Sequence, residues 1–94
     1  MLNFVICDDN LNILDRLEKM LDTIFCKNDF EAQVAFSSDN TEEVLNYISS
    51  NKVDVAMLDI NLKSNKTGIE LAKEIRKINK NIYIIFTTGH LEYA

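Results

Sequence analysis

The feature that most constrains the fold of this chain is an apolar segment, residues 53–61, that carries an aspartate near its end. Val55 to Leu58 are apolar and polar residues flank the segment, which is typical of a strand covered on both faces of a sheet. Asp59 lies where this strand is predicted to end. An ionised carboxylate at that place costs several kcal/mol unless a cation or hydrogen-bond donors meet it. The segment therefore predicts a central strand that presents Asp59 to a site.

Strand-like and helix-like segments alternate along the rest of the chain. Runs of β-branched and aromatic residues predict strands, and apolar residues at three- and four-residue spacing predict helices. The predicted strands are residues 3–7, 32–36, the central segment and 82–86, and the predicted helices are residues 12–27, 40–50 and 67–78. The last strand is expected to be buried like the central one, the second to lie at an edge, and residues 90–94 are where a fourth helix can begin.

Capping residues mark the predicted helix starts. Asn12 is a candidate N-cap of the first helix, and Asn10 competes for that role. Asn40 and Thr67 each stand three residues before a glutamate, which predicts a capping box at the start of the second and third helices. The buried face of the first helix is predicted to comprise Leu14, Leu17, Leu21 and Ile24.

The composition limits the class of protein. The 94 residues are 47% hydrophobic and 27% charged, which predicts one domain over residues 1–94. The net charge of -5 disfavours nucleic-acid binding by these residues. No apolar run approaches the roughly 20 residues that cross a bilayer, and no export signal is visible. Cys7 and Cys26 match no zinc pattern and are expected to be reduced core residues of a cytoplasmic protein.

The alternation predicts an α/β fold, a doubly wound parallel sheet with helices on both faces and strand order 2-1-3-4. This order has a switch point between the first and the third strand. Ligands bind outside the carboxyl ends of strands at such a point. Asp8 and Asp9 follow the first strand, Asp59 ends the third and Thr88 follows the fourth. We therefore expect an acidic pocket with a hydroxyl beside it.

Such a pocket favours metal-dependent phosphoryl chemistry. Two carboxylates about 5 Å apart repel by roughly 3 kcal/mol at an effective dielectric near 20, so the cluster needs a divalent cation, raised pKa values, or both. All-oxygen ligands suit Mg²⁺, or alternatively Mn²⁺. Asp59 is then a candidate nucleophile that forms an aspartyl phosphate, and Thr88 a candidate donor to a phosphoryl oxygen.

Each of these residues also has a plainer interpretation. Asp59 can simply start the next loop by accepting backbone hydrogen bonds. Asp8 and Asp9 can favour a helix dipole, and Thr88 can be an ordinary strand residue. Asn61 is a natural loop residue. The functional interpretation is favoured because these side chains stand on separate elements whose ends meet at the edge where this fold places its sites.

The motifs together resemble the receiver domain of bacterial two-component response regulators. The resemblance runs in order through residues 5–9, 57–62, 68–72 and 84–90, read as Val-Ile-Cys-Asp-Asp, Met-Leu-Asp-Ile-Asn-Leu, Gly-Ile-Glu-Leu-Ala and Ile-Ile-Phe-Thr-Thr-Gly-His. Residues 6–9, 38–40 and 68–76 look closest to quorum-sensing regulators of the accessory-gene-regulator type, in which a receiver precedes a LytTR DNA-binding domain. The resemblance implies a flavodoxin-like (CheY-like) three-layer fold and a role in phosphorelay signalling and transcription regulation.

The resemblance also implies a role for each site residue. Asp59 accepts a phosphoryl group from a sensor histidine kinase. Asp9 and Asp59 bind Mg²⁺ directly, Asp8 acts mainly through water, and Asn61 contributes its backbone carbonyl. Thr88 takes the place of the switch hydroxyl, whose movement toward the phosphoryl group biases a two-state equilibrium. His90, close by, is expected to be a variable loop or helix-start residue.

Two departures from the family pattern matter. The loop after Leu62 lacks the proline that many receivers carry and looks one residue longer than usual. The chain also lacks the family's fifth strand and fifth helix, with the lysine that pairs with the phosphoryl group, so residues 1–94 are expected to be a truncated receiver. Its fourth strand is then an exposed edge, which favours a homodimer or segment exchange. DNA would be bound only through a further domain, and no membrane is expected as a partner.

Three other functions remain open from the sequence. A Mg²⁺-dependent phosphohydrolase with an aspartyl nucleophile normally has a second acid two residues later, where this chain has Asn61. A flavin-binding protein of the same sheet order needs a phosphate loop after the first strand, where Asp8 and Asp9 would repel phosphate. A receiver-like interaction module would never be phosphorylated. The favoured function is a self-phosphorylating signalling domain, which is not an enzyme that turns over a substrate.

Overall fold

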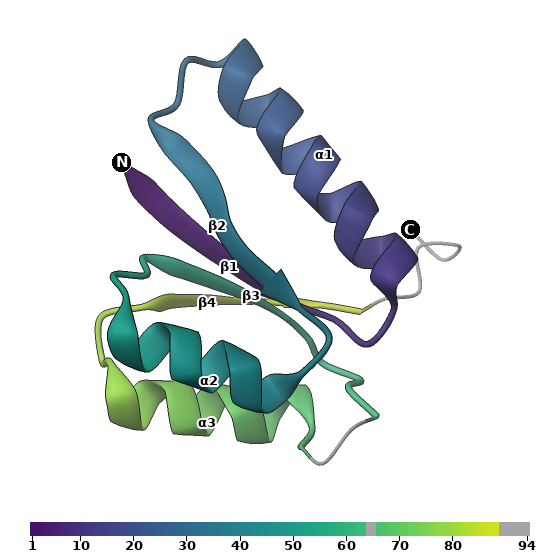
Figure 1. Ribbon diagram of the computed structural model, residues 1–94, viewed down its shortest axis with the longest axis vertical. Helices are drawn as coiled ribbons and strands as arrows, with labels where there is room; N and C mark the ends of the chain where they lie inside the picture. Colours follow the sequence, from purple (N-terminus) through teal and green to yellow (C-terminus); the bar gives the residue numbers. More distant parts are fainter. Residues whose placement is uncertain (64–65, 89–94) are drawn as a thin grey trace.

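The computed structural model describes residues 1–63 and 66–88. Its four strands form one parallel sheet in the order β2-β1-β3-β4, as predicted. Three helices connect them, and Figure 1 shows the layers. The elements are β1 (Leu2–Cys7), α1 (Leu11–Lys27), β2 (Ala32–Ser38), α2 (Thr41–Ser50), β3 (Val55–Asp59), α3 (Gly68–Ile78) and β4 (Tyr83–Thr87). The expected start of a fourth helix at 90–94, with His90, lies outside the described residues.

Two apolar clusters cover the two faces of the sheet, which confirms the three-layer arrangement. α1 packs on one face, and α2 and α3 pack on the other (Figure 1). Side chains alternate along a strand, so β1 serves both clusters: Val5 and Cys7 belong to the α2/α3 cluster, and Ile6 to the α1 cluster. In β3, Ala56 and Leu58 likewise face α2 and α3. The central strands are therefore buried on both sides, as the apolar segments predicted.

The start of α1 corrects the predicted cap. Asn10, the competing candidate, is the N-cap, and its side chain accepts hydrogen bonds from the backbone N–H groups of Asn12 and Ile13. The buried face of the helix ends in Phe25, whose ring centroid lies 5.0 Å from that of Phe4. Ile24 is partly exposed, so its predicted burial is wrong. Positions three and four residues after Leu21 both suit the buried stripe, and the larger ring fills the space.

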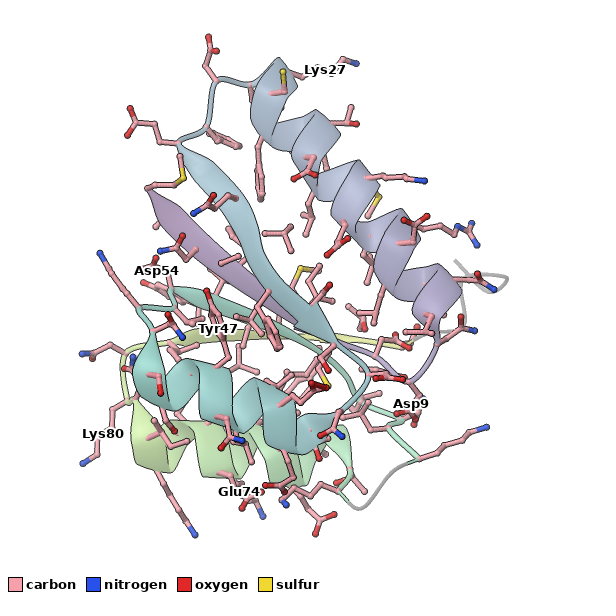
Figure 2. The ribbon with its side chains drawn as sticks, viewed as in Figure 1. Asp9, Lys27, Tyr47, Asp54, Glu74 and Lys80 are labelled. Atoms are coloured by element: carbon pink, nitrogen blue, oxygen red, sulfur yellow. The ribbon has the colours of Figure 1, made fainter. Side chains whose placement is uncertain are left out.

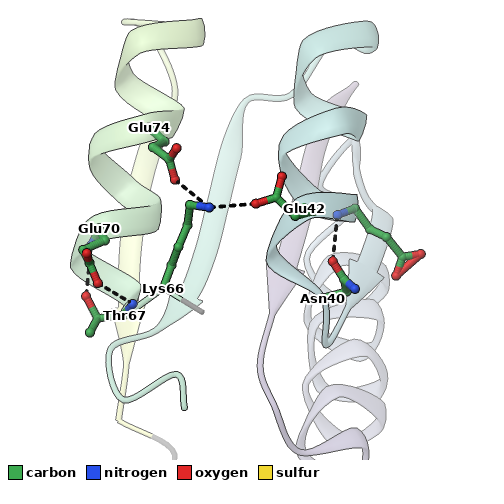
Figure 3. A network of polar contacts seen from close by, with 7 residues as sticks. Asn40, Glu42, Lys66, Thr67, Glu70 and Glu74 are labelled. Atoms are coloured by element: carbon green, nitrogen blue, oxygen red, sulfur yellow. Dashed lines mark hydrogen bonds and ion pairs between the residues drawn. The ribbon is translucent and has the colours of Figure 1, made fainter. Parts of the chain in front are cut away.

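The starts of α2 and α3 differ in their capping. Thr67 and Glu70 form the full predicted capping box, with both reciprocal hydrogen bonds present (Figure 3). At α2, the Asn40 side chain accepts from the Glu43 N–H, but the Glu43 carboxylate accepts from the Ser38 hydroxyl. The Asn40 N–H donates to the same hydroxyl oxygen. Ser38 thus completes the cap that the sequence assigned to two residues.

One lysine links the loop before α3 to two helices. Lys66 Nζ lies 2.7 Å from Glu42 Oε1 of α2 and 3.4 Å from Glu74 Oε2 of α3, as Figure 3 shows. The Lys66 side chain is 23% exposed, so the pair of contacts is only partly screened by water. The contacts raise the pKa of the Lys66 ammonium, with the Glu42 hydrogen bond as the largest cause. The end of this loop is therefore fixed against both helices.

The exposure of the fourth strand decides between two predictions, and one cysteine differs from expectation. The apolar run predicted a buried β4, which is wrong, because Tyr83, Ile85 and Phe86 are 73%, 45% and 43% exposed. The reason is that β4 is an edge strand, with β3 as its only neighbour in the described part of the sheet. The exposed edge that was expected from the missing fifth strand is observed in the described residues. Cys7 is buried as predicted, whereas Cys26 is exposed because it lies on the solvent side of α1 beside the buried Phe25.

The first residue of α3 packs directly on the end of β3. A Cβ atom at Gly68 would lie 2.2 Å from the Asp59 carbonyl oxygen and 2.8 Å from the Ile60 Cα. These distances are far inside van der Waals contact, so only glycine permits this approach. The glycine therefore determines how closely α3 approaches the strand that carries Asp59.

We predict that Gly68→Ala destabilises the protein. Helix propensity alone would favour alanine by up to about 1 kcal/mol, but the clash with the Asp59 backbone should outweigh it and lower the free energy of unfolding by about 1–3 kcal/mol. Denaturant unfolding followed by circular dichroism measures the change. Lys73→Ala, at an exposed position of the same helix, is the matched control and should stay within about 0.5 kcal/mol of the parent. A more stable Gly68→Ala variant would contradict the close approach.

Candidate functional site

Asp59 ends the central strand and is almost completely enclosed. Its residue surface is 7% exposed, and one carboxylate oxygen, Oδ1, accepts a hydrogen bond of 3.0 Å from the Asn61 N–H. The strand register places Asp59 opposite Thr87 of β4, and the Ile60 N–H donates to the Thr87 carbonyl at 2.9 Å. The sheet thus fixes the backbone on which this carboxylate is carried.

Asp8 is the most deeply buried acid of the described residues. Its residue surface is 1% exposed, and its backbone N–H continues the β1–β2 pairing by donating to the Ser38 carbonyl. Asp8 Oδ1 accepts from the Asn10 N–H at 2.9 Å. Asp8 Oδ2 is buried without any hydrogen-bond partner. A buried carboxylate oxygen without a partner is costly, so this atom indicates a place for a cation or a proton.

Asp9 lies at the mouth of the same site and is half-buried. Its Oδ2 accepts a hydrogen bond from the backbone N–H of Lys63, which stands in the loop after β3. Figure 2 shows Asp9 at the end of the sheet opposite to Asp54. Asp54 Oδ2 accepts a hydrogen bond from the Asn3 N–H at 2.8 Å. Among the described aspartates, only Asp8, at the carboxyl edge, has a buried oxygen without a hydrogen-bond partner.

The predicted site residues line one cleft. Its volume is about 590 Å³, and its walls come from the β1–α1 loop, the first turn of α1, the end of β3 with its loop, and the end of β4. The lining residues include all five predicted site residues, Asp8, Asp9, Asp59, Asn61 and Thr88. The Asn61 side-chain amide donates to the Thr88 carbonyl at 3.4 Å. The predicted gathering of these residues at the switch point is therefore observed, while their individual roles stay predictions.

Burial and like charge act on the ionisable groups of this cleft. The pKa of the Asp8 carboxyl is raised, chiefly by burial and further by the charges of Asp59 and Asp9, against the opposing effect of the Asn10 hydrogen bond. Burial raises the pKa of the neighbouring Cys7 thiol to about 12, and the nearby acids, Asp9 first, add to it. Burial and the neighbouring acids thus destabilise the ionised carboxylate of Asp8. A cation bound in the cleft would stabilise it.

The chemistry of these residues fits a divalent cation, although the three carboxylates do not stand as a preformed set of metal ligands. Within residues 1–63 and 66–88, no three His, Cys, Asp or Glu side chains form a ready metal-binding group. Asn10, Asn61 and Lys63 each direct a backbone N–H at one of the three aspartates instead. The partnerless oxygen of Asp8 and the purely oxygen donors of the cleft suit Mg²⁺ or Mn²⁺. A bound cation would offset both the cost of burying the Asp8 carboxylate and its repulsion by Asp59 and Asp9.

The sequence missed the backbone donors of the site. The N–H groups of Asn10 and Lys63 hold Asp8 and Asp9, and neither was predicted to contribute. Side-chain type carries no signal for a backbone donor. The one available signal was the absence of proline after Leu62, because a proline at position 63 would have no N–H to donate.

The chain matches the response regulator receiver domain family over residues 4–94. The sensory transduction protein LytT of Bacillus anthracis is 30% identical over 94 residues, which is 100% of this chain and 36% of the relative. The sensory transduction protein LytR of Staphylococcus epidermidis is 40% identical over 57 residues, 61% of this chain and 22% of the relative. The chain thus spans about a fifth to a third of the length of these curated relatives.

Two solved structures share the fold at 28–30% identity. The response regulator TrrA of Thermotoga maritima, in complex with Mg²⁺ and BeF, superposes with a TM-score of 0.77 at 28% identity, over 99% of this chain and 76% of that chain. A crystal structure of the histidine kinase ThkA in complex with TrrA gives a TM-score of 0.79 at 30% identity, over 96% of this chain and 71% of that chain. In the described residues, no helix is long and apolar enough to cross a membrane.

We predict that Asp8→Asn stabilises the metal-free protein at neutral pH. The variant removes a buried charge with a partnerless oxygen, so the free energy of unfolding should rise by about 1 kcal/mol, or roughly 4–8 °C in Tm for a domain of this size. Thermal unfolding in the presence of a chelator measures the gain. Since the folded-state pKa of Asp8 is raised, the gain should shrink as the pH falls and the parent takes up a proton there.

Asp39→Asn is the control for this prediction. Asp39 is exposed and its substitution removes the same formal charge, so a general relief of the net negative charge would stabilise both variants equally. An Asp8→Asn protein no more stable than the Asp39→Asn protein would contradict the electrostatic account of the cleft.

Proposed function

Since the chain belongs to the family of response regulator receiver domains, we propose that Asp59 accepts a phosphoryl group from a sensor histidine kinase in a Mg²⁺-dependent reaction. The observation that carries the proposal is the partnerless, buried Oδ2 of Asp8 in the cleft that Asp59 also lines. That arrangement costs stability in the metal-free protein and would be stabilised by a cation, which in turn would attract the phosphoryl oxygens. The kinship with LytR- and LytT-type regulators expected from the sequence is confirmed.

Asp59 has the properties that an acceptor needs. The hydrogen bond from Asn61 holds Oδ1, which sets the rotation of the carboxylate and leaves Oδ2 as the attacking atom. In the proposed step an oxygen–phosphorus bond forms at Asp59 as the bond between phosphorus and the donor's imidazole nitrogen breaks. The imidazole leaves with the bonding electrons and takes up a proton. The product is an acyl phosphate.

The remaining residues bind and orient the phosphoryl group. Asp8, Asp9, Asp59 and the Asn61 carbonyl are the proposed ligands of Mg²⁺. When bound, Mg²⁺ neutralises the carboxylates and polarises the phosphoryl oxygens. The Thr88 hydroxyl is proposed to donate to one phosphoryl oxygen at the β4 side of the cleft. Movement of the Thr88 hydroxyl toward that oxygen would bias an equilibrium between two conformations of the domain.

The proposed partners are a histidine kinase, DNA bound through a further domain, and a second copy of the chain. The TrrA structure with a histidine kinase supports a kinase as the phosphoryl donor. Relatives named as transcriptional regulators support an output in which DNA is bound through a further domain, and the net charge of -5 is in keeping with that division. The exposed apolar residues of β4 support self-association through this edge.

We predict a single phosphoryl adduct on Asp59. Incubation with Mg²⁺ and acetyl phosphate should increase the intact mass by one phosphoryl group. The adduct should be absent with a chelator and in the Asp59→Asn variant, while Asp54→Asn should label like the parent. Steady release of phosphate from an ester without a stoichiometric adduct would instead indicate a phosphohydrolase. If no adduct formed under any condition, the result would favour the alternative function, a receiver-like interaction module that is never phosphorylated.

We also predict that the 94-residue protein self-associates at high concentration. In the part of the chain that the structure describes, the outer backbone edge of β4 has no partner strand and is flanked by apolar side chains, which favours pairing with a second chain. Light scattering across a concentration series should show a rising mean mass. Ile85→Lys places a charge on this strand and should return the protein toward the monomer. A parent that stays monomeric throughout would rule out this edge as an interface.

A further inference from the structure

The loop after β3 is bound to the loop after β1 across the mouth of the cleft. The backbone N–H of Lys63 donates to Oδ2 of Asp9, and the two residues are 54 positions apart in the chain. Asn61, two residues before Lys63, is held by Asp59 in the same way. The two acids from neighbouring strands thus receive N–H groups from one short stretch of backbone.

The contact belongs to the backbone of Lys63 and not to its ammonium group. The Lys63 side chain is exposed and forms no ion pair within the part of the chain that the structure describes. Any residue with a backbone N–H therefore supplies the same donor, and proline alone removes it. Proline is also the residue whose absence distinguishes this loop from many sequences that it resembles.

We propose that the Lys63 N–H is a positioning group for Asp9. By holding Oδ2 it fixes the rotation of the carboxylate and leaves Oδ1 directed at a cation in the cleft. Groups that orient a metal ligand in this way typically change metal affinity by about 10–100-fold when removed. This inference rests on the proposed function, because it assigns the bond its purpose in binding the divalent cation.

The bond also fixes the loop at its beginning. Lys66 fixes the end of the same loop against Glu42 and Glu74, so the segment between Asp59 and α3 is held at both ends. A ligand that moves Asp9 therefore acts on the loop that leads to α3. Asp9 is in this way both a candidate metal ligand and the acceptor that holds the loop in place.

A pair of variants at one position separates the backbone from the side chain. Lys63→Ala keeps the N–H and removes the ammonium, whereas Lys63→Pro removes the N–H as well. Titration calorimetry with Mg²⁺ should give a Kd for Lys63→Ala within about twofold of the parent, and a Kd about tenfold weaker for Lys63→Pro. Equal affinity in the two variants, or tighter binding by Lys63→Pro, overturns the proposal. Thermal unfolding verifies that both variants fold.

A metal-free measurement tests the bond itself, whether or not the proline variant folds. Amide hydrogen exchange followed by NMR should show the Lys63 N–H protected in the parent and at least about tenfold less protected in Asp9→Ala. The Asn61 N–H, which is bonded to Asp59, is the internal reference and should be unchanged. An unprotected Lys63 N–H in the parent overturns the inference. If the Lys63 N–H is protected but the protein binds no Mg²⁺, the hydrogen bond is confirmed and the proposed function is overturned instead.

Discussion

The parallel alignment of β1, β3 and β4 is the constraint on which the rest of the structure depends. Three strands that run in one direction bring their carboxyl ends to one edge of the sheet. The residues that follow these strands therefore lie at that edge. The apolar clusters on both faces hold the strands in register. The acidic cleft is therefore a result of the core: the burial of Val5, Leu58 and their neighbours is what forces Asp8 and Asp59 together.

Bringing these acids together has an electrostatic cost that the fold only partly offsets. Backbone N–H groups meet one oxygen of each aspartate, yet Asp8 Oδ2 has no partner and the pKa of its carboxyl is raised. Asp54, at the other end of the sheet, is only half-buried and accepts a hydrogen bond from the Asn3 N–H. Among the described aspartates, the cost is therefore largest at Asp8, as expected for an acid at a ligand site.

The features that could be predicted from the sequence are those that depend on nearby residues in the chain. Strand order, the gathering of Asp8, Asp9, Asp59 and Thr88 and the Thr67 cap depend on residue type and spacing, and the structure confirms them. Periodicity tolerates a shift of one residue, which is why Phe25 replaced the predicted Ile24. Asn10 and Asn12 both suit an N-cap, so residue type alone did not decide between them. The exposure of β4 contradicts its apolar run and was expected only from the missing fifth strand. The donor at Lys63 depends on which segments become neighbours in space, and no local pattern carries that information.

The contact between Gly68 and Asp59 has a mechanical consequence. Most helices rest on a sheet through side chains, which rotate and absorb small displacements of the strand beneath. At Gly68 the backbone of α3 lies against the carbonyl group of Asp59 with no side chain between them. A shift of the strand end by a few tenths of an ångström cannot be taken up by a change of rotamer there. It is expected to pass directly into the first turn of α3, so the strand end that carries Asp59 and the start of this helix should move together as one rigid unit.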